Sequence, residues 1–140
     1  MTLVSVPREV KISKRDIESI LSAGKQSLPA EACGLMIGKK SDHVVICDHI
    51  VPTANMDRSP VSFTIAPEEL LKGYRHADKV GMALVGIYHS HPARAAPSLT
   101  DKGFMKWSAP IWLIVSSLDW DYAAYRLDGE GCTRVKISVV

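Results

Sequence analysis

Two histidines, His89 and His91, stand two residues apart at the end of an apolar run, Met82 to Tyr88. The run is typical of a buried strand, and on a strand residues i and i+2 point to the same face. Both imidazoles should therefore face the same way, with Cα atoms roughly 6.6 Å apart. Rings at that separation can close on one metal ion, each nitrogen lying about 2.0–2.1 Å from it.

A possible third ligand, Asp101, follows His91 by ten residues. Two histidines and one carboxylate are a usual zinc set, and three protein ligands leave the fourth position open for water. Pro92 cannot continue a strand ladder, so the chain should turn away directly after the histidines. A bare His-x-His is a weak signal for a metal. His-Ser-His-Pro after an apolar run, followed by Pro-Ser-x-x-Asp, is far more specific.

This stretch resembles the core of the JAMM motif of the MPN+ metallopeptidases, the Jab1/Mov34 family. The family pattern is a glutamate far upstream, then His-Ser/Thr-His, then Ser-x-x-Asp. The residues that match it by type here are His89, Ser90, His91, Ser98 and Asp101. Between the second histidine and the serine the chain has six residues, Pro92 to Pro97, which is one fewer than is usual in the family.

The upstream glutamate of the pattern is matched by Glu31, in the segment Pro-Ala-Glu-Ala-Cys-Gly at residues 29–34. Taken alone, a single glutamate before an apolar run is usually a solvated loop carboxylate. The family's catalytic glutamate commonly lies in a segment of this kind. The resemblance therefore implies that Glu31 is the catalytic glutamate.

The resemblance implies a zinc enzyme that hydrolyses an amide bond. Zn²⁺ would be held by His89, His91 and Asp101. Glu31 would accept a proton from water and deliver it to the leaving amine. Ser98 would donate a hydrogen bond to the oxyanion. A structural role is open for Ser98 as well, since it precedes a predicted helix and could serve only as its N-cap.

Catalytic members of the family cut after the Gly-Gly tail of ubiquitin or a ubiquitin-like protein. Small prokaryotic members, which this chain resembles most in size, act on ubiquitin-like modifiers and sulfur-carrier proteins. The resemblance therefore implies a deubiquitinase-like metallo-isopeptidase whose partners are such proteins and their conjugates. Two alternatives are processing of a sulfur-carrier precursor or adduct, and a non-catalytic MPN module that scaffolds a complex. Scaffold modules typically lack the ligands, which favours an enzyme here.

Other zinc enzymes fit the sequence less well. It contains no His-Glu-x-x-His, the helical zincin arrangement. It contains no Pro-Cys-x-x-Cys to complete a nucleotide deaminase. A (β/α)₈ barrel usually needs about 250 residues, and the chain has 140.

The elements that must position these residues follow from periodicity and turn signals. A capping box at Ser13 to Asp16 predicts a helix that stops at Pro29, and Pro67 predicts the start of a second helix lined by Leu70, Leu71, Tyr74 and Ala77. A third helix is predicted from Leu99 or Thr100 to about Trp107. Further strands are predicted at Val10–Ile12, after Gly34, and at Val44–Val51, Phe63–Ile65, Ile111–Ser117, Tyr122–Leu127 and Val135–Val140, with a loop at Pro52–Pro60.

Helices interleaved with strands predict an α/β fold with a mixed, curved β-sheet flanked by helices. The resemblance implies the MPN fold over nearly the whole chain. The length of 140 residues predicts a single domain, residues 1–140.

Composition argues against other classes of partner. With 46% hydrophobic residues, 23% charged residues and a net charge of +2, the sequence suggests neither nucleic acid nor a membrane. The N-terminus lacks the pattern of a signal peptide. The scattered cysteines Cys33, Cys47 and Cys132 predict reduced packing thiols in a cytoplasmic protein. His43, His49 and His76 have no spaced partner and are expected at the surface or a sheet edge.

Overall fold

The computed structural model describes residues 6–98, 101, 110–128 and 131–140. Its helices are α1 (Lys14–Ser27) and α2 (Pro67–Lys79). Its strands are β1 (Glu9–Ile12), β2 (Cys33–Ser41), β3 (Val44–Thr53), β4 (Ala83–His91), β5 (Ile111–Ser116), β6 (Tyr122–Asp128) and β7 (Gly131–Val139). The helix predicted at 99–107 lies outside the described residues except for Asp101, which is helical.

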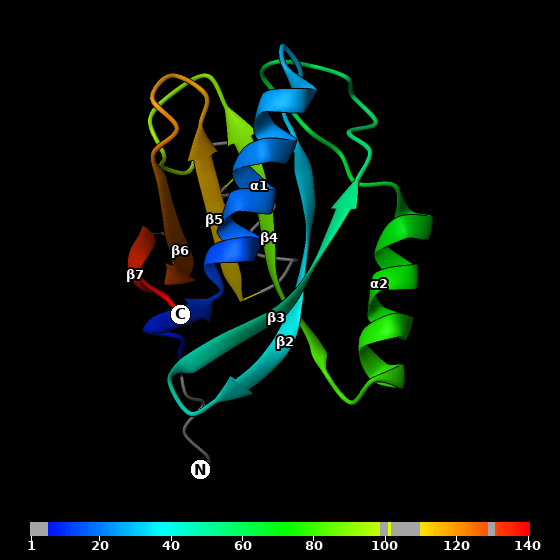
Figure 1. Ribbon diagram of the computed structural model, residues 1–140, viewed down its shortest axis with the longest axis vertical. Coiled ribbons are helices and arrows are strands. Elements are labelled where there is room, and N and C mark those ends of the chain that lie inside the picture. The colour runs from blue at the N-terminus through cyan, green and yellow to red at the C-terminus, as the bar shows by residue number, and fades with distance from the viewer. Residues whose placement is uncertain (1–5, 99–100, 102–109, 129–130) are drawn as a thin grey trace.

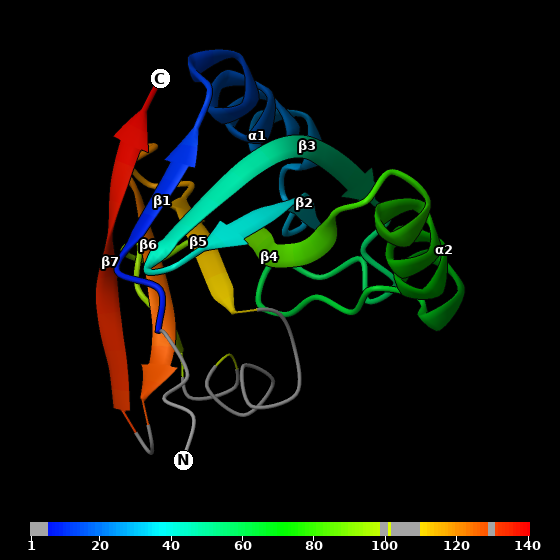
Figure 2. The same cartoon turned by 90° about the horizontal axis from the view of Figure 1, so that it is seen from below.

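The strands form a closed barrel in the order β1-β3-β2-β4-β5-β6-β7. β1 pairs in parallel with both β3 and β7, and β4 pairs in parallel with β5, while the other neighbours are antiparallel. Figure 2 shows β1 between β7 and β3. The predicted α/β fold with a mixed, curved sheet is confirmed. Closure of the barrel had no sequence signal, because it depends on the short β1 bridging two strands that are distant in the chain.

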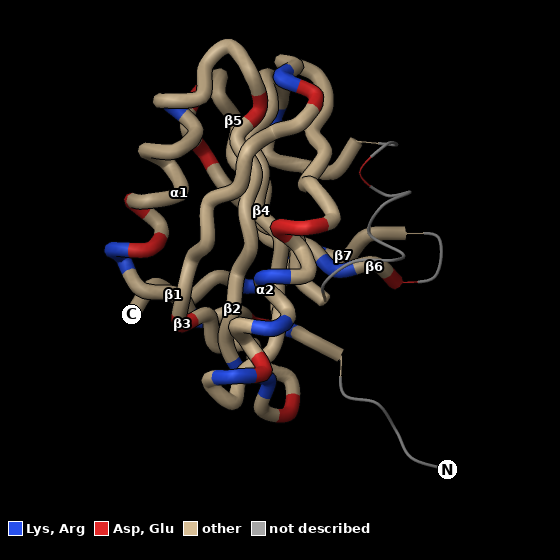
Figure 3. Tube along the Cα trace, turned by 90° about the vertical axis from the view of Figure 1, so that its right-hand side faces the viewer, with Lys and Arg blue, Asp and Glu red and all other residues tan. Residues whose placement is uncertain are grey.

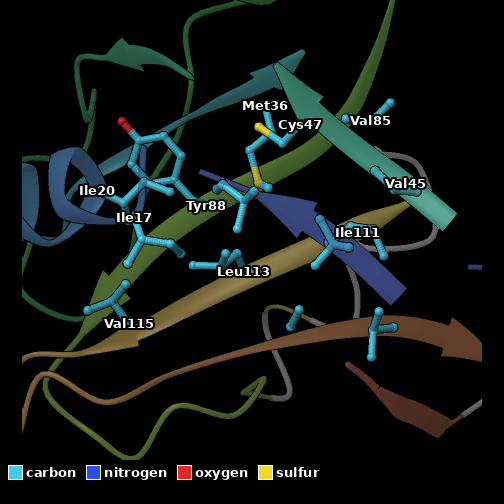
Figure 4. Close-up of a cluster of buried hydrophobic side chains, with 14 residues drawn as sticks. Ile17, Ile20, Met36, Val45, Cys47, Val85, Tyr88, Ile111, Leu113 and Val115 are labelled. Atoms are coloured by element: carbon cyan, nitrogen blue, oxygen red, sulfur yellow. The ribbon is translucent and has the colours of Figure 1, made fainter. Parts of the chain in front are cut away.

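Two apolar clusters lie on opposite faces of β2, β4 and β5. The inner cluster fills the barrel under α1, and Figure 4 shows Ile17 and Ile20 of α1 beside Tyr88 and Leu113. The outer cluster joins α2 to the other face through residues such as Ala77 and Trp112. In Figures 1 and 2 the helices accordingly lie apart, with α1 against the barrel and α2 at its outer side.

Helix α1 begins where the sequence indicated. The Ser13 side chain accepts a hydrogen bond of 3.0 Å from the backbone N–H of Asp16, as an N-cap does. The helix ends at Ser27, two residues before the proline expected to stop it.

Helix α2 corrects the prediction of its buried face. Leu71 and Tyr74 were expected on it, but they are 49% and 45% exposed. The helix packs through its small residues Gly73 and Ala77, which are buried. A Cβ at Gly73 would stand only 2.4 Å from Cδ1 of Leu35, so the absence of a side chain permits this close approach. The contact face is therefore rotated away from the two large residues.

The predicted strand Phe63–Ile65 is wrong, because this segment lies in an irregular connection between β3 and α2. Its backbone N–H at Thr64 bonds to the side chain of Asn55 instead of to a strand. The predicted loop also begins too early, since β3 continues through Pro52 to Thr53. Among the described residues, β1 pairs only with residues Val44 to Ile46 of β3, so the edge of β3 that faces away from β2 has no β1 partner at Pro52. A proline, which lacks an N–H, is tolerated at such an edge.

Strand β4 carries both motif histidines and ends at His91, directly before Pro92 as predicted. Tyr88 belongs to the inner cluster, so alternation sends His89 and His91 to the outer face. There the His89 ring contacts the rings of Phe63 and Trp112.

The other surface features agree with the composition. Figure 3 shows Lys and Arg interspersed with Asp and Glu along the trace. His49 and His76 are exposed, and Cys33 and Cys47 are buried, as expected. Within the described ranges, neither helix has the length and hydropathy needed to cross a bilayer.

Candidate active site

A cavity of about 480 Å³ lies beside the carboxyl end of β4. The five predicted site residues all line it, and they are Glu31, His89, His91, Ser98 and Asp101. The rest of the lining comes from Pro92 and Ala93 after β4 and from Asp57 and residues 61–64 before α2. The fold therefore gathers residues from three separate stretches of the chain around one space.

His89 stands between two carboxylates. Its Nδ1 lies 3.2 Å from Oε1 of Glu31, and its Nε2 lies 3.3 Å from Oδ2 of Asp101. The ring is only 1% exposed and stacks on Phe63, with ring centroids 4.6 Å apart at an angle of 23°. Sequence reasoning missed Phe63, because an aromatic residue in an expected strand is usually a core residue.

The two carboxylates control the charge of His89 in the metal-free protein. Burial opposes protonation, but the two carboxylates of Asp101 and Glu31 beside the ring outweigh it and raise the pKa of His89 to about 9. Burial and the neighbouring His89 lower the pKa of His91. Burial would raise the pKa of Asp101, but its contact with His89 prevails and lowers it.

The donor set suits a zinc ion. Nε2 of His89 is buried and has no hydrogen-bond partner among the described residues. Two ligands of a tetrahedral zinc, each about 2.0–2.1 Å from it, are about 3.3 Å apart. Nε2 of His89 and Oδ2 of Asp101 have that separation, 3.3 Å. The carboxylate of Glu31 on the opposite ring nitrogen is the usual partner of a metal-binding histidine.

His91 differs from His89 in its contacts. The two rings are stacked with centroids 5.3 Å apart, but Nε2 of His91 lies 3.1 Å from the carbonyl oxygen of Ala96. Within the described ranges, no three His, Cys, Asp or Glu side chains have the arrangement of a completed metal site. Because Nε2 of His91 contacts the Ala96 carbonyl, binding of a metal through this nitrogen would displace that carbonyl.

Ser98 and Asp101 form reciprocal hydrogen bonds. The hydroxyl oxygen of Ser98 accepts from the backbone N–H of Asp101 at 3.0 Å, and Oδ2 of Asp101 accepts from the backbone N–H of Ser98 at 2.9 Å. This is the pairing of a capping box. The Ser98 oxygen is used as an acceptor, so its own hydroxyl proton remains available for donation into the cavity.

The short loop after β4 is tied to β6 of the same barrel. The hydroxyl of Tyr125, on β6, donates a hydrogen bond of 2.8 Å to the carbonyl of Ala95. The next carbonyl, that of Ala96, contacts His91. The six residues between His91 and Ser98 thus reach across to Tyr125 and return to the cavity.

Glu31 is held by the strand that carries the histidines. Its neighbour Ala32 donates from its N–H to Oγ of Ser90 at 2.9 Å, and the Ser90 N–H donates to the Ala32 carbonyl at 3.0 Å. The Glu31 N–H donates to the Ser59 carbonyl at 2.8 Å. The serine between the two histidines therefore anchors the segment that contains Glu31.

Known proteins share this fold. Over residues 13–128 the chain matches the family described as prokaryotic homologues of the JAB domain. A solution structure of a protein from Desulfitobacterium hafniense has a TM-score of 0.83 and 29% identity, covering 94% of this chain and 92% of that one. A crystal structure of a JAB1/MPN domain protein from Archaeoglobus fulgidus has a TM-score of 0.58 and 20% identity, covering 92% of this chain and 97% of that one.

Relatives of the chain have names that describe an activity. A desampylase of Haloferax volcanii is 30% identical over 128 residues, which cover 87% of this chain and 90% of the relative. A CysO-cysteine peptidase of Mycobacterium tuberculosis is 29% identical over 129 residues, which cover 89% of this chain and 86% of the relative. Together with the family match over most of its length, these similarities establish that the chain belongs to the prokaryotic JAB domain family, with the JAB1/MPN fold.

Proposed function

We propose that this protein is a zinc-dependent isopeptidase that hydrolyses the bond after the C-terminal Gly-Gly of a ubiquitin-like protein. One observation carries the proposal. Nε2 of His89 is buried, makes no hydrogen bond among the described residues and stands 3.3 Å from Oδ2 of Asp101, in a cavity that Glu31 and Ser98 also line. A catalytic zinc site needs protein ligands beside a cavity that substrate can enter, and this arrangement offers both.

In this proposal His89, His91 and Asp101 hold the zinc ion. Zinc supplies a Lewis acid that polarises the amide carbonyl and acidifies water. Glu31 keeps the proton of His89 on Nδ1, which leaves Nε2 free as a ligand. No described residue is hydrogen-bonded to the second carboxylate oxygen of Glu31, Oε2, so that oxygen is free to accept a proton from water and pass it to the leaving amine.

Ser98 is the proposed donor to the oxyanion. Its Oγ accepts from the Asp101 N–H, which fixes the oxygen in place while its proton stays available. The same hydrogen bond ties Ser98 to the proposed ligand Asp101. A donor fixed in this way needs little reorganisation during the reaction.

The names of the relatives support a protein-modifier substrate. The desampylase suggests cleavage of a conjugate. So does a further relative from Thermus thermophilus, named "Probable TtuB-protein conjugate cleaving protease", which is 33% identical over 84 residues that cover 59% of this chain and 53% of the relative. The CysO-cysteine peptidase supports a second candidate, removal of an adduct from a sulfur-carrier protein. A scaffold role, the third possibility raised by the sequence, is disfavoured because the potential ligands line one cavity.

A panel of substrates tests the proposal. Zinc-loaded protein is incubated with prokaryotic ubiquitin-like proteins that end in Gly-Gly, joined either to a lysine side chain of a carrier protein or to a single cysteine. Mass spectrometry identifies the new termini. We expect cleavage after Gly-Gly at lysine. Cleavage of the cysteine adduct alone would favour the second candidate.

Two further substrates test the narrowness of the site. An extended tail held by backbone hydrogen bonds must lack bulk near the scissile bond. A conjugate whose last glycine is changed to valine should resist cleavage, and a short Gly-Gly-lysine peptide should be a much poorer substrate than the intact conjugate. Equal cleavage of either one would contradict the proposal and indicate a general zinc peptidase.

A further inference from the structure

Asn55 is the only asparagine in the sequence and lies in the connection between β3 and α2. Its side-chain amide is hydrogen-bonded at both the nitrogen and the oxygen. Its Nδ2 donates to the carbonyl of Glu31 at 3.0 Å and to that of Ser62 at 2.9 Å. Its Oδ1 accepts from the N–H of Asp57 at 3.0 Å and from that of Thr64 at 3.2 Å. An amide offers two donors and two acceptor positions, and all four are occupied.

These four partners belong to two walls of the same cavity. Asp57, Ser62 and Thr64 line it from the connection, and the Glu31 side chain lines it from the segment before β2. A backbone hydrogen bond of 2.9 Å from Met56 to Thr64 closes the base of the connection. Asn55 is therefore the side chain that joins the irregular wall to the backbone of Glu31.

The position of Glu31 depends on such contacts because it precedes the strand ladder. β2 begins at Cys33, so the Glu31 carbonyl receives no strand hydrogen bond and takes Asn55 as its donor. On its other side, the N–H of Glu31 bonds to Ser59 of the same connection. Both backbone polar groups of Glu31 thus end on residues 55–59.

We propose that Asn55 is a positioning residue that fixes Glu31 relative to residues 57–64, the wall of the cavity formed by the connection between β3 and α2. The inference rests on the proposed function, in which Glu31 transfers the proton. A displacement of about 1 Å in a reacting group can reduce a rate on the order of 100-fold. Loss of the Asn55 donors therefore lowers turnover through Glu31, although Asn55 itself touches no reacting atom.

Asn55→Asp tests the donor bonds of the amide separately from its acceptor bonds. A carboxylate keeps the size and the acceptor positions but has no donors, so the bonds to the carbonyls of Glu31 and Ser62 are lost. We expect kcat to fall roughly 10–100-fold with a smaller change in KM, and zinc content to stay unchanged. In the zinc-free protein the backbone N–H of Glu31 should exchange with solvent faster.

Ser138→Ala is the matched control for a general loss of stability. Ser138 on β7 donates a side-chain hydrogen bond to Glu9 on β1, and neither residue lines the cavity. This variant should melt at a lower temperature and keep normal turnover. A drop in kcat equal to that of Asn55→Asp would overturn the inference, because ordinary destabilisation would then explain both.

A double-mutant cycle with Glu31→Gln gives the decisive comparison. If Asn55 acts through Glu31, adding Asn55→Asp to Glu31→Gln should change the residual kcat less than about twofold, within the additivity error of such cycles. Losses that multiply would overturn the inference, as would normal turnover by Asn55→Asp alone. Normal turnover by Glu31→Gln would overturn the proposed function and this inference with it, so the two failures are distinguishable.

Discussion

Glu31 and His89 are 58 residues apart in the chain, yet Oε1 of Glu31 lies 3.2 Å from Nδ1 of His89. The register of two antiparallel strands explains this contact, since Cys33 at the start of β2 pairs with His89 near the end of β4. A residue just before β2 must therefore arrive beside the histidines. Glu31 can in this position orient His89 and still offer its second oxygen to a proton.

The first prediction concerns the metal ligands. His89→Ala and His91→Ala should each sharply lower the zinc content below one ion per chain, because each removes one of three ligands. Elemental analysis of purified protein measures this. His49→Ala is the matched control, since His49 is exposed on β3 and does not line the cavity. Stoichiometric zinc in both motif variants would refute the ligand assignment.

The second prediction concerns pH in the metal-free protein. The pKa of His89 is raised from 6.5 to about 9 in the folded state. Protonated His89 therefore stabilises the fold, and this stabilisation is at its full size below pH 6.5, the pKa of the unfolded state. That contribution is lost as the pH rises from about 6.5 to about 9. Urea unfolding of chelator-treated protein should show a falling free energy of unfolding across this window. His89→Gln should flatten the decline, and an unchanged decline would contradict the assignment.

The third prediction concerns Ser98. Ser98→Ala removes both the cap of the Asp101 N–H and the proposed oxyanion donor. Stability should fall by about 1 kcal/mol, and kcat should fall on the order of 10²–10³-fold. Ser98→Thr keeps a hydroxyl and should retain much of both. An alanine variant that melts lower but turns over normally would show that Ser98 is a cap alone.

The fourth prediction concerns the short loop between His91 and Ser98. Tyr125→Phe deletes only the hydroxyl that holds the Ala95 carbonyl. One such hydrogen bond contributes about 0.5–1.5 kcal/mol, so zinc should dissociate up to about tenfold faster as the loop beside His91 loosens. Tyr122→Phe, also on β6, is the control, because no described residue bonds its hydroxyl. Equal zinc dissociation from both variants would rule out a role for the tie.

The sequence predicted best what depends on local pattern. The apolar run predicts a strand, and Pro92 predicts where it ends. Because side chains alternate between the two faces of a strand, His89 and His91 are then placed on one face at its end. Ser13 likewise marks the start of α1 through a contact only three residues long. These features depend on neighbours in the chain, so a single sequence contains their signal.

The missed features depend on contacts between distant residues. Nothing near Asn55 in the sequence indicates that its amide joins Glu31 to the wall of the cavity. Phe63 was expected to pair as a strand, but it covers the ring of His89 from an irregular segment. Closure by β1 similarly requires β3 and β7 to approach from opposite ends of the chain.

The role of Glu31 is tested most directly by comparing Glu31→Gln with the natural protein for bound zinc and for cleavage of a Gly-Gly lysine conjugate. Glu31 is proposed as a base and not as a ligand, so the variant should keep its zinc and its fold. Turnover should fall by roughly 10²–10⁴-fold, the scale of general acid–base catalysis. Full turnover by a zinc-loaded Glu31→Gln protein would exclude Glu31 as the base, and loss of its zinc would make Glu31 a ligand instead.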